Sequence, residues 1–339
     1  VQTCALPIYT PLWLEADLPH AIHYAFSYDE EVGGWGAMNL IKDLQEAGVA
    51  PRICLVGEPT DMIPALAHKG VHRWHCHVRG KAAHSSLTPL AVNAVEAASR
   101  LVAHIADLGD QLRAGPDQQA GFDVPWTTSA VCRLAGGIAD NIVPEDCRIT
   151  YEFRDLPGTD VDALQQQVES RARALEGAMQ AVDPSSGFRF EKFTAMPAFR
   201  AAPDEPAVQL ALRLAGTRQT TLVAFGTEAG LFQKAGISTV VCGPGHIAQA
   251  HQADEYVSLA QLAACERFLA AIRQRDLVPL WVGGVVFATC LAAPFTFFAT
   301  FVMAEPIATA GLFFSCYSIA AITLLQLRFT RLADDASRR

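Results

Sequence analysis

Short apolar segments alternate with longer amphipathic ones through residues 12–274, and this alternation constrains the fold more than any other feature of the chain. Short apolar runs bounded by Gly or Pro are typical of strands, whereas apolar side chains that recur every three or four positions are typical of helices. Strands and helices that follow one another along a chain pack as layers. We therefore predict an α/β fold.

The order of the predicted elements changes at Gly70 and again after Pro206. A strand at 21–26, a helix at 36–46 and a strand at 52–56 precede Gly70. The next elements follow the order β-α-β-β-α-β of a ferredoxin-like unit, and they lie at 71–78, 93–108, 128–134, 148–153, 161–181 and 188–193. The α/β alternation then resumes, with predicted helices at 206–214, 228–235 and 258–273 and a strand at 239–242.

This change of order predicts a small ferredoxin-like domain inserted into a larger α/β domain. The predicted parts are a segment outside the fold at 1–8, the larger domain at 9–69 and 196–276, the inserted domain at 70–195, an apolar hairpin at 277–327 and a basic tail at 328–339. Residues 1–8, VQTCALPI, lack the charged start of a signal peptide and resemble the translation of a sequencing-library adapter. We expect the true reading frame to be interrupted just before Tyr9.

The apolar hairpin is predicted from two segments without charged side chains, at 277–304 and 306–327. About 20 apolar residues cross a bilayer, so each segment is long enough to span one. We predict two transmembrane helices that meet at Glu305, and the basic residues at their outer ends place both ends in the cytoplasm. A buried helical hairpin in a globular core is the alternative.

Charge and cysteine usage exclude some classes of protein. Lys and Arg total 26 against 35 Asp and Glu, and the net charge of −9 repels a phosphate backbone, so we expect no nucleic-acid partner. A content of 51% hydrophobic and 18% charged residues excludes intrinsic disorder. The 9 cysteines form no Cys-x-x-Cys pair, and we expect reduced thiols in the cytoplasm.

Three acidic residues, Asp29, Glu30 and Glu31, directly follow the first predicted strand. Neighbouring side chains leave such a segment in different directions, so one carboxylate could bind a metal while the next holds the water that the metal acidifies. Acidic residues also favour a helix N-terminus, so a structural role is the alternative.

Other candidate residues follow later strands. Glu58 ends the next strand, where α/β folds bind ligands, although it could be a turn residue. His251 lies in a loop near carboxylates, and imidazole suits zinc, but loop histidines are commonly only solvated. Gly226 and Thr227 precede a helix and could bind an anion through backbone N–H groups, or Thr227 could simply cap the helix.

The inserted domain contributes His84 and Asn141 in two turns and Arg154 at the end of a strand. Arg is suited to bidentate binding of a carboxylate. We interpret three further histidines in or near one strand as structural, namely His72, His75 and His77.

Taken in order, eight segments resemble the two-zinc aminoacylase and carboxypeptidase family. They are SYDEEVGGWGA, LVGEPT, HKG, GKAAHSS, NIVPEDC, FRDLPG, FGTEAGLF and GPGHIAQAHQADEYV. The resemblance implies an α/β zinc-hydrolase catalytic domain, an inserted lid that also forms a homodimer, and two zinc ions that share a water molecule, with cobalt as the alternative metal. It implies hydrolysis of an N-acyl amino acid, and we expect N-acetyl-L-ornithine to be cleaved to acetate and L-ornithine.

The resemblance also implies roles for individual residues. Glu31 and His251 would bind one metal ion and Glu58 the other, while Glu30 would be the general base. His84 of a partner subunit would stabilise the oxyanion. The substrate would be held by four residues of this chain: Asn141, Arg154, Gly226 and Thr227.

The sequence departs from the family pattern upstream of Asp29, where the family has a His-x-Asp motif and a bridging Asp that this chain lacks. We therefore expect the chain as written to bind metal weakly and to hydrolyse little substrate. Another N-acyl amino acid or dipeptide hydrolase of the family is one alternative. A second alternative is a non-catalytic binding protein that is tethered to the membrane through 277–327. A third is that this apolar hairpin belongs to a neighbouring gene and was joined to the chain by an assembly error.

Overall fold

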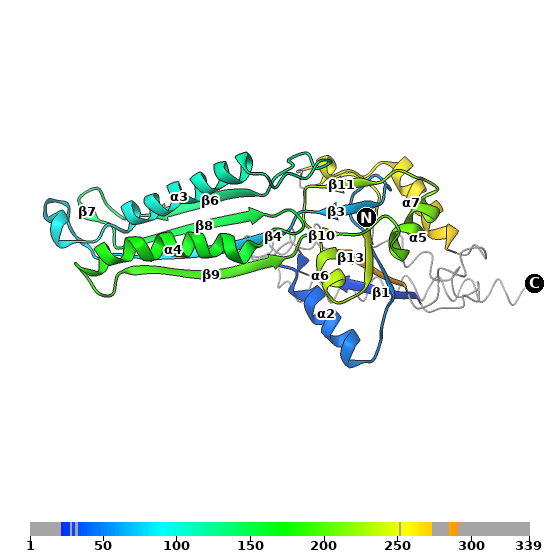
Figure 1. The fold of residues 1–339 in the computed structure, drawn as a ribbon, viewed down its shortest axis with the longest axis horizontal. Coiled ribbons are helices and arrows are strands. Elements are labelled where there is room, and N and C mark those ends of the chain that lie inside the picture. The colour runs from blue at the N-terminus through cyan, green and yellow to red at the C-terminus, as the bar shows by residue number, and fades with distance from the viewer. Residues whose placement is uncertain (1–21, 28, 31–32, 251, 273–284, 291–339) are drawn as a thin grey trace, which may run out of the picture. The chain divides into compact units, whose positions relative to one another are not determined.

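The computed structural model describes residues 22–27, 29–30, 33–250, 252–272 and 285–290. Their elements belong to a larger sheet with its helices and to a smaller sheet with two helices (Figure 1). The α/β prediction is confirmed, and so are the predicted strands and helices in both parts, with ends that differ by a few residues.

The larger sheet has seven strands in the order β1-β13-β2-β12-β3-β10, with β11 also paired to β3. The parallel strands are β1 (Ile22–Ser27), β13 (Val285–Cys290), β2 (Ile53–Val56) and β12 (Ser238–Val241). At the other side lie β3 (Ala65–His68), β10 (Phe199–Arg200) and β11 (Thr221–Val223). Because the parallel strands point the same way, their carboxyl ends lie at one edge of the sheet.

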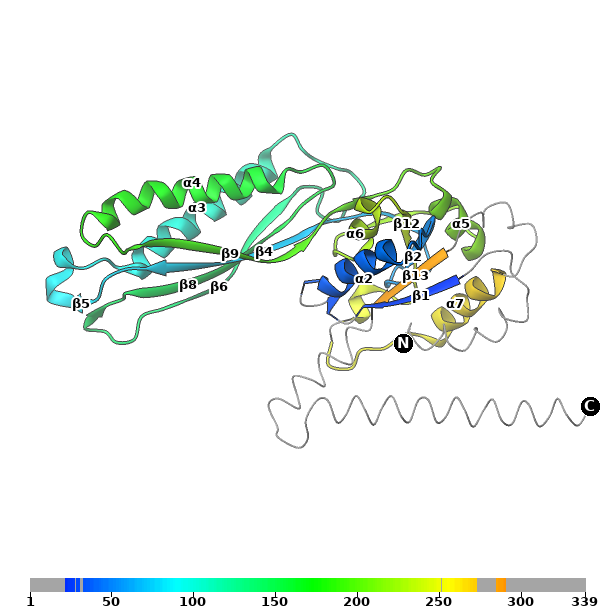
Figure 2. The ribbon, with the colours of Figure 1, turned by 90° about the horizontal axis from the view of Figure 1, so that it is seen from below.

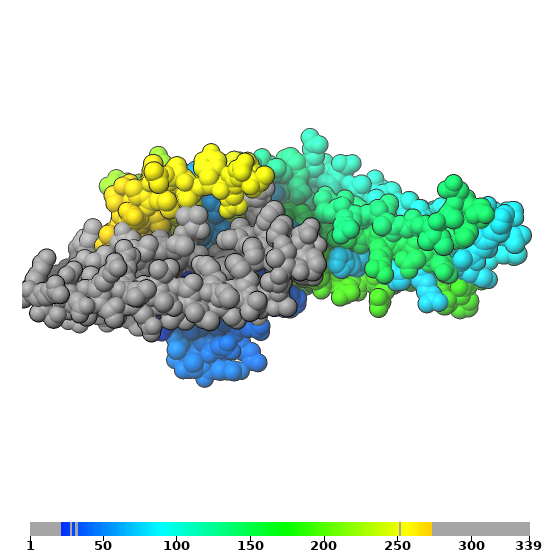
Figure 3. Space-filling view, turned by 180° about the vertical axis from the view of Figure 1, so that it is seen from behind, coloured from blue at the N-terminus to red at the C-terminus, as the bar shows by residue number. Residues whose placement is uncertain are grey.

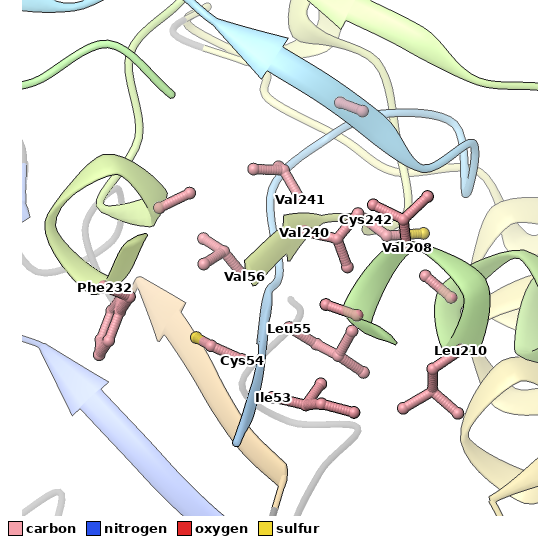
Figure 4. Close-up of a cluster of buried hydrophobic side chains, with 14 of the residues drawn as sticks. Ile53, Cys54, Leu55, Val56, Val208, Leu210, Phe232, Val240, Val241 and Cys242 are labelled. Carbon is pink, nitrogen blue, oxygen red and sulfur yellow. The ribbon is translucent and has the colours of Figure 1, made fainter. Parts of the chain in front are cut away.

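Four helices of the described residues accompany this sheet: α2 (Trp35–Glu46), α5 (Pro206–Ala215), α6 (Ala229–Lys234) and α7 (Leu259–Ala271). Helix α5 contacts α7 and β12, whereas α6 contacts α2 and β12. All four residues of β2 are buried, as expected for a parallel strand covered on both faces, and Figure 4 shows their side chains among Leu210 and Phe232. The helix α7 and the loop before it reach the molecular surface (Figure 3), where Leu259 is exposed.

The smaller part is a β-α-β-β-α-β unit, as predicted. Its antiparallel sheet has the order β6-β8-β4-β9. Its elements are β4 (Val71–Arg79), α3 (Ala94–Ala114), β6 (Thr128–Gly136), β8 (Asp146–Arg154), α4 (Val161–Gln180) and β9 (Gly187–Met196). Both helices cover the same face of the sheet (Figure 2), and Asn93 and Asp160 cap their N-termini.

Aromatic side chains explain why this unit has a core of its own. Trp74 stacks on Tyr151 with ring centroids 5.6 Å apart and meets the edge of Phe153, and all three are buried beneath the helices. Alternation along β4 and β8 places these apolar side chains on the helix face and polar side chains on the open face. The connection between β4 and α3 carries β5 (Ala83–His84) and η2 (Ser85–Leu90), and β7 (Ile142–Val143) pairs with β5.

The predicted transmembrane hairpin at 277–327 was wrong. Val285–Cys290, inside the first predicted span, form strand β13 between β1 and β2. Among the described residues, no helix has the length and apolar character needed to cross a membrane. The rest of the predicted hairpin, at 277–284 and 291–327, lies outside the described residues, as does the segment 1–8. A parallel strand inside a sheet is apolar throughout, so a strand of this kind also explains why Val285–Cys290 include no charged residue.

Candidate active site

Candidate residues from distant parts of the sequence meet at the carboxyl edge of the larger sheet. Asp29 and Glu30 follow β1, Glu58 follows β2, and Gly243 follows β12, and these strands run parallel to one another through β13. Ligands of α/β sheets bind at this edge. The structure thus brings Glu30 and Glu58 to the same edge, while Glu31 and His251 lie outside the described residues.

The turn after β1 separates a structural carboxylate from a candidate catalytic one. Oδ1 of Asp29 accepts a hydrogen bond from the backbone N–H of Gly36 at 2.7 Å, at the start of α2, and its backbone oxygen accepts one from Gly34 at 3.1 Å. Gly34 has a φ of 70°, which glycine adopts without strain. Asp29 therefore has a structural role at the start of α2, which is the alternative considered above. The half-buried Glu30 is the next residue along the chain.

The loop after β2 is locked to the loop after β12. The backbone N–H of Thr60 donates to the oxygen of Gly243 at 3.2 Å, and the N–H of Gly243 donates back to Thr60 Oγ1 at 3.2 Å. A Cβ on Gly243 would lie 2.6 Å from the backbone oxygen of Glu58, so this close approach requires glycine. These contacts fix the backbone that carries Glu58, and they connect it to the loop that leads toward His251.

The Gly226-Thr227-Glu228 turn is tied to β1 by a buried hydrogen bond. Ser27 Oγ donates to Glu228 Oε2 at 2.9 Å, and Glu228 is only 1% exposed. Thr227 Oγ1 accepts from the N–H of Ala229 at 3.0 Å, which closes a turn just before α6, but the N-cap residue of this helix is Glu228 and no side chain caps it. The sequence interpretation missed Ser27 and Glu228 as partners because the two residues are 201 positions apart.

The junction between β3 and β4 is built around buried polar groups. Lys69 Nζ donates to the backbone oxygen of Trp126 at 2.6 Å, and burial lowers the pKa of Lys69, opposed by the charge of Asp155. Gly70 donates its N–H to the backbone oxygen of Asp155 at 2.8 Å, and a Cβ on Gly70 would lie 2.3 Å from that carboxylate. His72 Nδ1 is 2.9 Å from Asp155 Oδ1, which agrees with a structural role for this histidine.

The same junction connects the inserted unit to the Gly226 turn. A Cβ on Gly226 would lie 2.4 Å from Val71 Cγ2 and 3.2 Å from the backbone oxygen of Lys69. Arg154, the last residue of β8, is close enough to Lys69 for its charge to lower the pKa of the lysine. Because the N–H of Gly70 donates to Asp155, the residue after Arg154, and Gly226 packs against Val71, this junction links the end of β8 to the Gly226 turn.

His84 and Asn141 lie at the other end of the inserted sheet. Ser85 donates its backbone N–H to the oxygen of Asn141 at 2.9 Å, and His84 Nδ1 is 2.8 Å from Ser86 Oγ, with both candidate side chains exposed. Strand β8 has nine residues from this end to Arg154, and the steps between them span roughly 27 Å at about 3.4 Å per residue. Within one subunit the structure does not bring His84 and Asn141 to Arg154.

The predicted donor types suit a metal site, but the described residues complete only part of it. Carboxylate oxygens and imidazole nitrogens are ordinary zinc ligands. Of the three predicted ligands the structure describes Glu58 alone, and the described residues include no group of three His, Cys, Asp or Glu side chains that could hold a metal ion. The ligand set therefore stays a prediction.

Comparison with known proteins defines the class. Residues 66–179 match the model of the M20 peptidase dimerisation domain. Among solved structures, the fold is similar to aminopeptidase PepT from Bacillus cereus (21% identity, TM-score 0.54, 68% of this chain and 59% of that one) and to an M20 metallo-carboxypeptidase from Sulfolobus solfataricus (17%, 0.51, 72% and 69%). The family resemblance is confirmed by the matched dimerisation domain and by the fold that the chain shares with these solved structures.

Within this class, the chain is similar to acetylornithine deacetylases. It is 34% identical over 251 residues to the protein of Myxococcus xanthus, an alignment that covers 71% of this chain and 61% of the relative. It is 33% identical over 232 residues to the protein of Salmonella typhimurium, covering 68% of this chain and 57% of the relative. The chain thus spans about three fifths of the length of these relatives.

Proposed function

We propose that the protein is a metal-dependent amidohydrolase that cleaves N-acetyl-L-ornithine to acetate and L-ornithine. The observation that carries this proposal is the position of Glu30 and Glu58 at the carboxyl ends of parallel strands in one sheet. The substrate is proposed from the similarity to acetylornithine deacetylases.

The metal ligands in this proposal are Glu58, Glu31 and His251, and zinc is the ion that we propose. A bound ion of this kind lowers the pKa of its water from about 15.7 toward 7. Glu30 would then accept the proton of that water and deliver it to the leaving amine. The short connection through the Gly33-Gly34 turn supports this division of roles, because it anchors Asp29 to α2 and leaves the next carboxylate at the strand end.

Substrate contacts would come from both parts of the chain. Arg154 would bind the carboxylate of the substrate, and the Gly226-Thr227 turn would hold its backbone atoms. His84 would stabilise the oxyanion, and Asn141 would contact the substrate, from the lid of a partner subunit. A homodimer is supported by the match to a peptidase dimerisation domain, and the separation of His84 from Arg154 along β8 supports their action in opposite subunits.

Acetate release from N-acetyl-L-ornithine by the zinc-loaded protein, expressed from its complete gene, tests the proposal. Glu30→Gln should reduce kcat by about a hundredfold or more, since it removes the base while keeping the shape of the side chain. The matched control is Glu46→Gln on α2, whose carboxylate is exposed and should leave kcat unchanged. N-succinyl amino acids and dipeptides assayed in parallel identify the substrate class, and unchanged turnover in Glu30→Gln would reject the assignment.

A further inference from the structure

Two arginines share one carboxylate on the open face of the inserted sheet. Arg73 on β4 and Glu152 on β8 lie directly opposite each other, and Arg154 is two residues further along β8 on the same face. Arg73 Nε donates to Glu152 Oε2 at 2.9 Å and Arg154 Nε donates to Glu152 Oε1 at 2.9 Å. Each oxygen of the carboxylate is thus taken by a different guanidinium.

This arrangement is ordered and partly shielded from water. The Glu152 side chain is 15% exposed, that of Arg73 31% and that of Arg154 28%. Burial alone would raise the pKa of Glu152, but the hydrogen bonds and charges of Arg154 and Arg73 outweigh it, so the pKa is lowered and the carboxylate stays ionised. Charge-assisted hydrogen bonds of this kind are stronger than neutral ones and fix geometry.

The pairing through Nε decides which edge of Arg154 can bind a ligand. A guanidinium is a planar fork with five donors: one edge carries Nε and one terminal nitrogen, and another edge carries the two terminal nitrogens. With Nε held by Glu152, the terminal edge of Arg154 remains suited to a second carboxylate. This residue ends β8, and the next residue, Asp155, accepts the backbone N–H of Gly70 at the junction with the larger sheet.

The net charge of Arg73, Arg154 and Glu152 indicates which kind of ligand they would bind. Arg73 and Arg154 contribute two positive charges and Glu152 one negative charge, which leaves one net positive charge. The nearby Lys69 is balanced by Asp155, whose charge raises the pKa of the lysine. One uncompensated positive charge matches a ligand with one carboxylate near this position.

We propose that Glu152 and Arg73 are positioning residues that orient Arg154 and limit its subsite to a single substrate carboxylate, so that the enzyme prefers N-acyl amino acids without a second acidic group. This inference rests on the proposed function, in which Arg154 binds the substrate. Arg73 touches Glu152 rather than the substrate, so its effect reaches the substrate only through Arg154.

The test compares two substrates of nearly equal shape, N-acetyl-L-glutamine and N-acetyl-L-glutamate, which differ by one negative charge. Glu152→Gln should shift the ratio of their kcat/KM values toward the glutamate compound by about tenfold, because the subsite then has two net positive charges. Arg73→Gln should raise KM for N-acetyl-L-ornithine by about tenfold with kcat unchanged, and Arg73→Lys should restore part of that loss. Arg148→Gln, on the same strand and face but exposed at its far end, is the matched control.

The outcomes separate the inference from the proposed function. If the wild type turns over N-acetyl-L-ornithine and neither the ratio nor KM changes in the variants, the positioning role is rejected while the function stands. If no substrate is turned over, the proposed function fails, and calorimetric titration with N-acetyl-L-ornithine replaces kinetics. Loss of binding in both Arg154→Gln and Arg73→Gln would then support the positioning role, and equal binding in all variants would overturn it.

Discussion

The buried histidine at the end of β3 should make the stability of the protein depend on pH. His68 is completely buried, its Nδ1 lies 2.8 Å from the backbone oxygen of Lys69, and burial lowers its pKa from 6.5 to about 4. Between these values the unfolded chain binds more protons than the folded one, so the free energy of unfolding decreases as the pH falls from about 6.5 to about 4. At about 1.4 kcal/mol per pKa unit, going from pH 7 to pH 5 should remove about 2 kcal/mol.

Urea unfolding of the full chain at pH 7 and pH 5 measures this loss. His68→Gln keeps a side-chain N–H donor and cannot titrate, so the difference between the two pH values should shrink by about 2 kcal/mol relative to the wild type. His246→Gln removes an exposed histidine instead and should retain the wild-type difference. An equal loss of stability in the wild type and His68→Gln would refute the assignment of a neutral buried histidine.

Three further outcomes follow from buried contacts elsewhere in the structure. Ser27→Ala leaves the buried Glu228 without its hydroxyl donor and should lower the free energy of unfolding by about 1–3 kcal/mol, measured with urea. Gly70→Ala should cost about 1–3 kcal/mol in the same assay because the new methyl group overlaps the carboxylate beside it, and an unchanged midpoint would contradict the contact. Burial raises the pKa of Cys242 to about 12, so peptide mapping after brief iodoacetamide treatment should find the exposed Cys132 modified and Cys242 unmodified, and the reverse pattern would contradict the burial.

Elements whose pattern is local were predictable from the sequence. The four-residue strand β2 is apolar throughout because it is buried on both faces, and β4 and β8 alternate because one face packs on helices. The β-α-β-β-α-β order followed from these periods and from the turns between them. The same reasoning failed for Val285–Cys290, because an uncharged run is compatible both with a membrane span and with a strand inside a parallel sheet.

Contacts between distant residues could not be predicted in this way. The hydrogen bond from Ser27 to Glu228 and the pairing of Arg73 with Glu152 depend on how the chain folds. The sequence around one of these residues does not reveal which distant residue is its partner. Candidate residues at strand ends were predictable because topology alone brings parallel carboxyl ends together, as it does for Glu30 and Glu58. Their chemical roles were suggested by family resemblance and stay predictions.

The central claim is that carboxylates at the ends of β1 and β2 form part of a metal-dependent hydrolytic site. Its most direct test follows acetate release from N-acetyl-L-ornithine by the protein, expressed from its complete gene, after removal of metal with a chelator and again after addition of Zn²⁺. We predict loss of activity on removal, recovery with Zn²⁺, and recovery in Glu58→Gln only at higher zinc concentrations, because one ligand is weakened. Activity that survives chelation, or recovery in Glu58→Gln at the wild-type zinc concentration, would contradict the account.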